Sequence, residues 1–507
     1  MLSNLRRYVR ILTLGLLVVG LSSCVDLLIP VMLRSRDRDR EEDALKYTNL
    51  FAKSALQTYY LWNEEVAEQL DNWLADGDPA AQVLDARYRS EPGVMVDRWT
   101  QLIPNIRNFQ SSVAGESADT YGYDLKLMYR DEAHTEIAAV VILTYDGGPA
   151  SQAGLKRGDV IVRVNGKKMT PANYVRIVED ELLTAGRLTL TLEDGREVTL
   201  SSAPMYENPV LAYRILEEGS RRVGYLAYNG FTPNSYQELI TVCKGFRAAG
   251  ISDLILDLRY NGGGYAVAEE VLASMLAPEP AVQAGELLST EIYNRLMMEY
   301  FASRGEDTKK YFRQDFAFQI NGSNYRFSTA DANARPGRIF AIVTGSTASA
   351  SEALLCDLMA YMPVYLVGEQ THGKFCAGFP LAAEDYFDDV SGQMGAGKAS
   401  QGKRATKDIG LYVMVSRFTD KNGETRCMPD GLAPDYPAED NPLDGCQLGD
   451  PSETMLSLAL SACGFAPAPQ RAHRATPARR LDAVTASPVR AGDGYRILSE
   501  LPAGPVE

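Results

Sequence analysis

The sequence predicts an α/β protein built from a helical N-terminal unit, a β-rich domain and an α/β core. Three patterns support this expectation. Apolar residues recur at helical spacing after residue 44, short strands alternate apolar and polar residues after residue 120, and strands alternate with helices from about residue 210. A chain of 507 residues is too long for one ordinary hydrophobic core, so several domains are expected.

The first residues have the layout of an export signal. Three arginines, Arg6, Arg7 and Arg10, precede an apolar stretch at 11–21. Leu21-Ser22-Ser23-Cys24 follows, and small residues before a cysteine resemble a bacterial lipobox. We expect cleavage before Cys24, lipidation of its thiol and a charged tether at 24–43. The alternative is an uncleaved anchor lengthened by apolar residues 25–33.

Composition and cysteine usage limit the partners and cofactors. A net charge of −15 would repel nucleic-acid phosphates, so nucleic acid is not an expected partner. The six cysteines beyond Cys24 could form disulfides in an exported chain, but no spacing fits a metal site. We expect neither a metal nor an organic cofactor.

The helical pattern near the N-terminus carries a stripe of aromatic residues. Its members recur every three or four residues: Tyr47, Phe51, Ala55, Tyr59 and Trp62. Core packing is the favoured interpretation, and a platform for substrate is the alternative.

A β-rich segment resembles a PDZ domain. The resemblance is carried by the run 147–161, from Gly147-Gly148-Pro149 to Gly158-Asp159-Val160-Ile161, and by the following Val164-Asn165-Gly166. Such a domain binds an extended peptide as an added strand, while amides of a nearby loop hold a terminal carboxylate. Tyr123, Asp124 and Leu125, which follow Gly122, occupy the place of that loop and are the candidate peptide-binding residues. The acidic Asp124 would not help an anion bind.

Two loops of the α/β part hold a serine and a lysine. Ser349 follows the apolar stretch 339–343 and precedes a helical pattern, so we expect its hydroxyl at the positive end of a helix dipole. Lys374 follows the short strand 364–367, so we expect it at the same sheet edge.

A serine hydroxyl is a weak nucleophile that needs an adjacent base. Of the three histidines only His372 is near, so a Ser-His-Asp triad would have to use it; a Ser-Lys pair is the favoured arrangement. A lysine accepts a proton only when uncharged, which burial against Phe375 would favour.

Acyl transfer also needs donors for a developing oxyanion. The strand 254–258 runs into a glycine triplet, and amides of Gly263 or Gly264, together with that of Ala350, could form such a site. A plain glycine turn is the alternative.

Together these motifs resemble the carboxy-terminal processing peptidases, also called tail-specific proteases. The motifs are Asp257-Leu258-Arg259-Tyr260-Asn261-Gly262-Gly263-Gly264, Thr347-Ala348-Ser349-Ala350-Ser351-Glu352 and Gly368-Glu369-Gln370-Thr371-His372-Gly373-Lys374. The resemblance covers about 122–435 and implies a ClpP/crotonase-like core. It implies Ser349 as nucleophile, Lys374 as base and Ala350 with Gly263 or Gly264 as oxyanion donors. Glu352 and Thr371 match supporting positions.

The resemblance has departures. Many members carry Gln four residues after the lysine and Gly directly after it, where this chain has Gly378 and Phe375. Some have Asp at the position of Ala360. The sequence therefore leaves open what orients Lys374. The run Tyr59-Tyr60-Leu61-Trp62 looks like the helical unit of lipoprotein members from gut-type Bacteroidetes.

These expectations combine into one domain plan and one function. The expected parts are a signal peptide at 1–23, a lipid-anchored tether at 24–43, a helical domain at 44–115, a PDZ domain at 120–205, an α/β serine peptidase domain at 210–463 and a disordered tail at 464–507. The expected function is a lipid-anchored envelope endopeptidase that captures the C-termini of protein or peptide substrates. The alternatives are an idle peptide-binding protein and a crotonase-like enzyme acting on acyl-CoA. The oligomeric state stays open.

Overall fold

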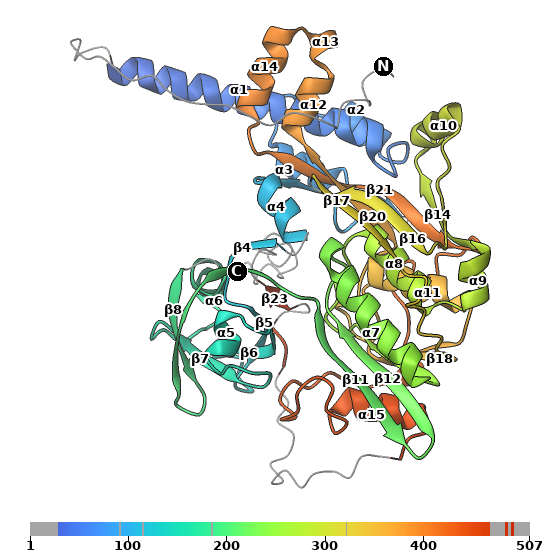
Figure 1. Ribbon diagram of the computed structural model, residues 1–507. Helices are drawn as coiled ribbons and strands as arrows, with labels where there is room; N and C mark the ends of the chain where they lie inside the picture. The colour runs from blue at the N-terminus through green and yellow to red at the C-terminus, as the bar shows by residue number, and fades with distance from the viewer. Residues whose placement is uncertain are drawn as a thin grey trace. The chain divides into compact units, whose positions relative to one another are not determined.

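The computed structural model describes residues 29–90, 93–113, 116–183, 186–320, 322–466, 482–484 and 488–490 (Figure 1). The expected signal peptide and Cys24 lie outside the described residues. The chain divides into two compact units. The first unit contains residues up to Arg107 with 294–297 and 378–415, and the second contains 108–293, 298–377 and the rest of the chain from Ser416.

The first unit is mainly helical. Its helices are α1 (Ile29–Tyr59), α2 (Ala67–Asp71), α3 (Pro79–Asp85), α12 (Ala383–Asp389), α13 (Ser391–Met394) and α14 (Ala396–Ala405). The aromatic stripe packs inside it: the ring of Tyr47 contacts Phe387, and that of Phe51 contacts Tyr386. The stripe is therefore core, as its spacing predicts. The segment 378–415, which we expected in the peptidase domain, belongs to this unit.

Short strands interrupt the predicted helical region. β1 (Arg89–Ser90) pairs with β2 (Val94–Met95), and β3 (Gln101–Ile103) pairs with the first residues of β21 (Gly410–Asp420). α4 (Ile106–Val113) follows.

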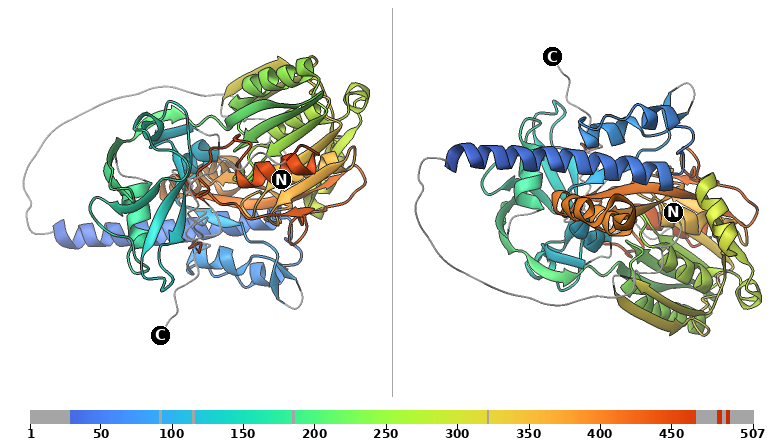
Figure 2. Two further views of the ribbon diagram at one scale, coloured as in Figure 1. Left: turned by 90° about the horizontal axis from the view of Figure 1, so that it is seen from below. Right: turned by 90° about the horizontal axis from the view of Figure 1, so that it is seen from above.

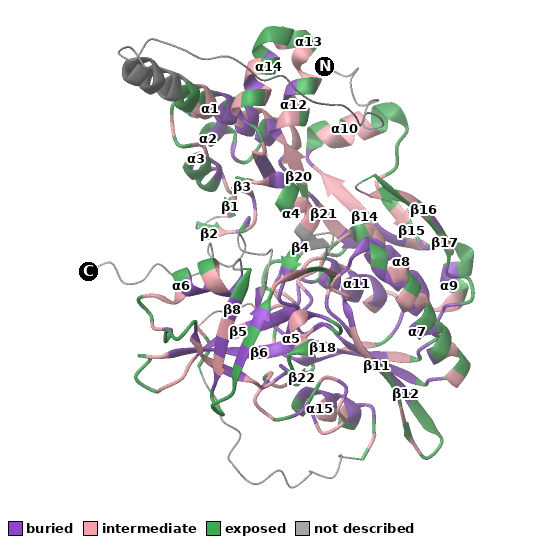
Figure 3. Cartoon of the chain, turned by 60° about the vertical axis from the view of Figure 1, so that its left-hand side comes forward, coloured by how far each residue is buried: buried purple, intermediate pink, exposed green. Residues whose placement is uncertain are grey.

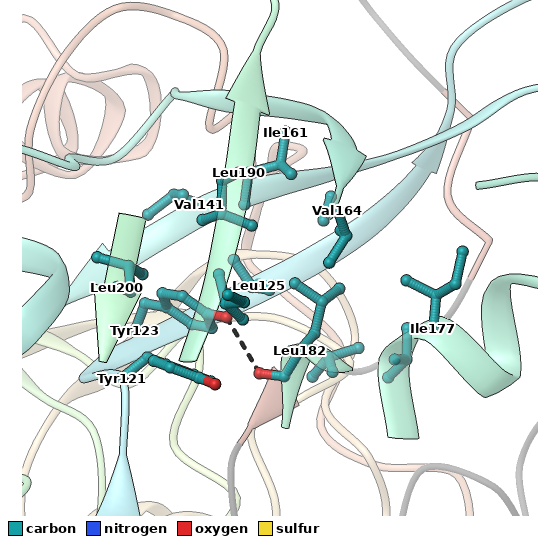
Figure 4. Packing of buried hydrophobic residues seen from close by; sticks show 14 of the residues in the cluster. Tyr121, Tyr123, Leu125, Val141, Ile161, Val164, Ile177, Leu182, Leu190 and Leu200 are labelled. Carbon is teal, nitrogen blue, oxygen red and sulfur yellow. Dashed lines mark hydrogen bonds between the residues drawn. The ribbon is translucent and has the colours of Figure 1, made fainter. Parts of the chain in front are cut away.

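The PDZ-like domain is an antiparallel sheet in the second unit. Its sheet has the order β23-β5-β6-β7-β8-β9. The strands are β5 (Tyr123–Tyr129), β6 (Ile137–Thr144), β7 (Val160–Val164), β8 (Arg187–Leu192) and β9 (Glu197–Ser201), with helices α5 (Pro149–Gln152) and α6 (Tyr174–Ile177) and a π-helical turn at 178–182. β5 and β6 are buried along most of their length (Figure 3). Their inward side chains form one apolar cluster (Figure 4).

The strand β23 (Val489–Arg490) comes from the tail of the chain. It pairs antiparallel with β5. The tail that we expect to be largely disordered, 464–507, therefore contains a paired strand at 489–490. The physical reason is strand pairing with an available sheet edge, which the composition of the tail does not reveal.

The α/β core is a six-stranded sheet with the order β11-β12-β13-β18-β19-β22. The strands are β11 (Val210–Glu218), β12 (Arg221–Tyr228), β13 (Asp253–Asp257), β18 (Arg338–Val343), β19 (Val364–Gly368) and β22 (Tyr436–Pro437). β11 and β12 are antiparallel, and the remaining neighbours are parallel. This confirms the predicted largely parallel sheet.

Helices cover both faces of this sheet (Figures 1 and 2). On one side lie α7 (Tyr236–Ala249), α8 (Ala266–Leu276) and α11 (Ala350–Met359); on the other lies α15 (Thr454–Ala462). Tyr225, Ile255 and Phe340 alternate along the strands with residues of the opposite face and pack against Met455 and Leu456 of α15. Both faces are therefore apolar, which explains the continuous apolar runs of β13 and β18.

The segment between β13 and β18 adds α9 (Glu279–Ala284), β14 (Leu287–Tyr293), α10 (Arg295–Arg304), β15 (Lys309–Tyr311) and the hairpin β16 (Asp315–Ile320) and β17 (Ser323–Ser328). β4 (Glu116–Thr120) pairs with β10 (Ala203–Tyr206), and β20 (Cys376–Ala382) precedes α12. Within the described ranges no helix has the length and apolarity needed to cross a membrane.

Candidate active site

Three loops meet at the carboxyl edge of the parallel sheet. Asp257 ends β13 beside Ile342 of β18, and Val343 ends β18 beside Gly368, the last residue of β19. The loops after these strands carry the glycine triplet, Ser349 and Lys374. Because parallel strands end at one edge, the three sequence motifs come together there, as predicted.

Ser349 has a backbone conformation that is unusual for a residue with a side chain. Its φ is 59° and its ψ is −118°, and α11 begins at the next residue. Such positive φ values cost of the order of 1 to 3 kcal/mol and persist only where the surroundings enforce them. The predicted position at a helix N-terminus is correct, and it places the serine at the positive end of the α11 dipole.

The buried carboxylate of Glu352 connects the serine loop to the lysine loop. Its Oε2 accepts the amide N–H of Ser349 at 3.0 Å and that of Lys374 at 2.8 Å. Its Oε1 accepts the hydroxyl of Thr371 at 2.6 Å and the amide of Gly373 at 2.7 Å. Burial raises the pKa of this carboxyl, and the hydrogen bonds from Thr371 and the amides oppose the shift.

A second contact fixes the lysine loop from the other side. The hydroxyl of Thr371 accepts the amide of Leu432 at 2.7 Å, and the amide of Thr371 donates to the carbonyl of Leu432 at 3.1 Å. A Cβ at Gly431 would lie 2.1 Å from the carbonyl oxygen of Thr371, so only glycine allows this approach. Lys374 itself is 4% exposed, so its backbone and its side chain are both enclosed.

The glycine triplet lies directly against the serine. A Cβ at Gly263 would be 2.7 Å from Cβ of Ser349 and 3.0 Å from the amide nitrogen of Ala350. Asn261 tightens the contact, because its carbonyl accepts the amide of Ala348 at 3.1 Å and the hydroxyl of Ser351 at 2.9 Å.

The amide of Gly263 donates to the side-chain oxygen of Asn261 at 2.9 Å. In this arrangement it is engaged inside the loop. Gly264 follows with φ of 145°, and its Cα approaches the carbonyl oxygen of Phe231 so closely that a Cβ would lie 2.3 Å from it. The amide of Ala350 is in the first turn of α11, where amides have no acceptor within the helix.

His372 contacts the backbone of the loop that carries Ser349. Its amide donates to the carbonyl of Thr347 at 3.0 Å, and its Nδ1 lies 3.3 Å from the carbonyl oxygen of Gly345. The residue is partly buried. These contacts attach the lysine loop to the serine loop by a second route.

The departures from the family pattern have local explanations. Gly378 is in the first unit, where a Cβ would lie 2.3 Å from Cζ of Tyr412 and 2.4 Å from Cε of Met414. The ring of Tyr412 therefore fills the space that a larger side chain at 378 would need. Phe375 is 1% exposed and supplies apolar surroundings next to Lys374, as predicted. Ala360 ends α11.

The three predicted peptide-binding residues lie on β5 or at its start. The side chains of Tyr123 and Leu125 point into the domain core, and the hydroxyl of Tyr123 donates to the carbonyl of Leu182 at 3.0 Å (Figure 4). Asp124 is buried, and its Oδ2 accepts the amide group of Asn229 at 3.2 Å. Only the backbone of these residues faces an added strand.

A buried ionic cluster, which sequence reasoning missed, joins the PDZ-like domain to the α/β core. Arg157 donates to Asp440 at 2.8 Å, and Arg259 contacts Asp440 at 3.0 Å and Glu453 at 2.7 Å. Tyr260 donates to Asp440 as well. Burial alone would raise the pKa of Asp440, but Arg157 and Arg259 hold it well below its usual range.

Two members of this cluster, Arg259 and Tyr260, precede the glycine triplet, and only Asn261 separates them from it in the sequence. The arginine-aspartate partners are distant in sequence, so no spacing pattern could predict them. The only sequence signal is an arginine in a turn of the PDZ-like run, at Arg157, where a polar surface residue is the default expectation.

Comparisons with known proteins agree with this architecture. The model of peptidase family S41 matches residues 222–438, and the PDZ domain model matches residues 140–184. The α/β part of this chain, residues 222–438, is an S41 peptidase domain. It contains all three loops of the site, and the PDZ domain provides the sheet that β23 joins.

Curated relatives of this chain are carboxyl-terminal processing proteases. The protein from Synechocystis is 28% identical over 284 residues, which cover 53% of this chain and 55% of the relative. The chloroplastic C-terminal processing peptidase of Tetradesmus obliquus is 25% identical and covers 59% of this chain and 60% of its own length. The chain thus spans between half and two thirds of the length of these relatives.

A solved structure shares the fold of this chain. A putative S41 protease from Bacteroides fragilis aligns with a TM-score of 0.59 over 82% of this chain and 97% of its own, at 21% identity. The predicted α/β peptidase fold with a PDZ domain is therefore confirmed. Across the described part of the chain, no group of His, Cys, Asp and Glu side chains is arranged to hold a metal ion.

Proposed function

We propose that this chain is a serine endopeptidase of the carboxyl-terminal processing type. The observation that carries the proposal is the convergence of three loops on Ser349. The glycine loop lies against its Cβ, and the carboxylate of Glu352 ties its amide to that of Lys374.

In the proposed reaction Ser349 is the nucleophile and Lys374 the general base. Oγ of Ser349 attacks the carbonyl carbon of the scissile peptide bond while its proton passes to the uncharged Nζ of Lys374. The carbonyl π bond breaks, and its electron pair forms an oxyanion. Collapse of this intermediate breaks the C–N bond, and Lys374 returns the proton to the leaving amine. Water then hydrolyses the acyl-enzyme by the same path.

The oxyanion would accept hydrogen bonds from backbone amides of the two flanking loops. Ala350 contributes from the first turn of α11, and the glycine loop contributes Gly264 or, after release from Asn261, Gly263. A donor of this kind typically contributes about 3 to 4 kcal/mol to transition-state stabilisation. Glu352 and Thr371 position the base loop without touching the substrate.

The substrates would be proteins or peptides captured by the PDZ domain, which adds an extended segment to the edge of β5. The chain would be anchored by a lipid on Cys24 to a bacterial membrane and would face the periplasm or the exterior. Mass spectrometry of the mature N-terminus tests the anchor: a lipid-modified cysteine at 24 supports it, and an unmodified Met1 contradicts it.

Proteolysis is tested with three proteins and one substrate. Wild type, Ser349→Ala and Lys374→Met are incubated with an unstructured protein that ends in apolar residues. We expect both substitutions to reduce cleavage by a factor of about 1000 or more, because nucleophile and base act as one unit. Equal cleavage by wild type and Ser349→Ala would reject the assignment, and binding without cleavage by all three would favour the idle peptide-binding protein.

A further inference from the structure

The outer edge of β5 is the place where a PDZ domain adds a peptide strand, and part of this chain's own tail lies there (Figure 1). Val489 is opposite Leu125 and Arg490 is opposite Asp124 in an antiparallel register. Further along, the amide of Val484 donates to the carbonyl of Leu127 at 2.9 Å, and the amide of Tyr129 donates to the carbonyl of Asp482 at 2.8 Å. Two short pieces of the tail therefore follow the same strand.

The side chain of Val489 is an anchor in this arrangement. It is completely buried and belongs to the apolar cluster of the PDZ domain, together with Leu125 and Leu182. Val484 packs against the same cluster and is partly buried. Burial removes the apolar surface of the valine side chain from water, so Val489 is the main apolar anchor of this segment.

The second piece also has a polar contact. The carboxylate of Asp482 lies 2.9 Å from Nε2 of His134, whose ring stacks on Tyr129 with centroids 4.0 Å apart. Both side chains of the ion pair are exposed, so its contribution is small compared with that of Val489.

The tail segment runs antiparallel to β5, as a captured C-terminus would, but it is an internal segment of the chain. Its backbone heads along β5 toward Gly122, and the sequence continues beyond Arg490. No terminal carboxylate is required at the loop, where the buried Asp124 is already hydrogen bonded to Asn229. The recognised element is thus an extended backbone with a β-branched residue in the buried position.

We propose that the edge of β5 is a peptide-binding site for extended segments with a small β-branched residue at the buried position, and that the chain's own segment around Val489 occupies this site in competition with substrates. The proposal rests on the proposed function only in that the competing ligands are substrates. Because the segment is tethered, its effective concentration is of the order of millimolar, which lets a weak contact stay formed.

Occupancy of the site by the tail reduces the apparent affinity for any other peptide. If the tail covers the site about 90% of the time, a peptide in solution binds about ten-fold more weakly than to an open site. Removal of the tail anchor should restore the intrinsic affinity. In the closed form the tail occupies the site, and in the open form a variant tail leaves the site free for another peptide.

Binding is measured by fluorescence anisotropy in the Ser349→Ala background, where cleavage is prevented. The probe is a labelled peptide with the sequence of residues 482–490, Asp-Ala-Val-Thr-Ala-Ser-Pro-Val-Arg. We expect Val489→Asp in the full chain, and a chain ending at Arg480, to bind the probe at least ten-fold more tightly than the unchanged tail does. The control is Thr199→Asp, which adds the same charge to an exposed residue of β9, at the opposite edge of the sheet, and should leave the affinity unchanged.

Amide hydrogen exchange tests where the tail lies. In the unchanged tail the amide of Tyr129 should be protected; it should exchange faster in Val489→Asp and in the chain ending at Arg480, and become protected again when the probe is added. Equal probe affinity for open and closed forms, absence of binding to the open form, or unchanged exchange at Tyr129 would each overturn the proposal. These readouts need no catalysis, so their failure is distinct from a failure of the peptidase assignment.

Discussion

The backbone amides of Ser349 and Lys374 donate to the same carboxylate oxygen, Oε2 of Glu352, at 3.0 and 2.8 Å. The serine and lysine loops are therefore connected through one buried acceptor. The other oxygen of Glu352 holds Thr371 and Gly373. A carboxylate suits this position because it is the side chain that accepts at both oxygens and donates at neither.

Glu352→Gln should disturb both loops while preserving the size of the side chain. Whichever way the new amide lies, its NH₂ group faces at least one backbone N–H that needs an acceptor. We expect stability to fall by about 1 to 3 kcal/mol and kcat to fall by about 100-fold, because small displacements of reacting groups are costly. Urea unfolding and peptide cleavage measure the two effects. Glu424→Gln, an exposed position, is the control, and wild-type kcat in Glu352→Gln would show that the bridge does not position the base.

Gly263→Ala tests the close contact between the glycine loop and the serine. The added methyl group would lie 2.7 Å from Cβ of Ser349, and the φ of 102° is itself unfavourable for alanine. We expect at least a 100-fold loss of kcat/KM, since the serine or the loop must move. Gly245→Ala is the matched control: it lies in α7 with open space around it, and there alanine should stabilise the helix by about 1 kcal/mol. Normal cleavage by Gly263→Ala would contradict the proposed role of the loop.

At Ser349 a glycine should give a more stable protein than an alanine, which is the reverse of the order inside a helix. At φ of 59° glycine fits without strain, so we expect Ser349→Gly to be about 1 kcal/mol more stable than Ser349→Ala. At Ser457, in the middle of α15, the order should be reversed by a similar amount, because glycine is a poor helix residue. Unfolding in urea gives both differences. The same order at both positions would mean that the backbone of Ser349 relaxes freely.

The core of the site follows from the sequence because local patterns determine it. The predicted strands 339–343 and 364–367 lie inside or at the ends of β18 and β19, and parallel pairing brings the loops after them to one edge. The start of α11 at Ala350 could be predicted from the change of periodicity.

Other features depend on contacts between distant residues. Arg157 and Asp440 form a buried pair although they are 283 positions apart in the sequence, and each would be assigned to the surface by its type. The pairing of Val489 with β5 uses a strand too short to stand out in the sequence. The segment 378–415 joins the first unit because of tertiary contacts such as that between Tyr47 and Phe387. No periodicity in one segment contains this information.

Asp357 should make stability fall as the pH rises. It is buried on α11, and within the described part of the chain neither of its carboxylate oxygens has a hydrogen-bond partner. Burial, followed by the nearby Glu269, raises the pKa of Asp357 well above 3.8, so the folded state holds its proton more tightly than the unfolded state. Cys356, Asp420 and Glu270 act in the same direction.

The sign of the effect follows from this difference in proton binding. The stabilising contribution of protonated Asp357 is complete below pH 3.8, the ordinary pKa of the group. It is lost as the pH rises through the higher pKa of Asp357 in the folded state. Between these two values each pH unit removes about 1.4 kcal/mol. Asp357→Asn cannot lose a proton, so its unfolding free energy should decline less steeply than that of the wild type as the pH rises above 3.8. Asp146→Asn, an exposed position, should keep the wild-type slope, and identical slopes for all three proteins would show that Asp357 is ionised in the fold.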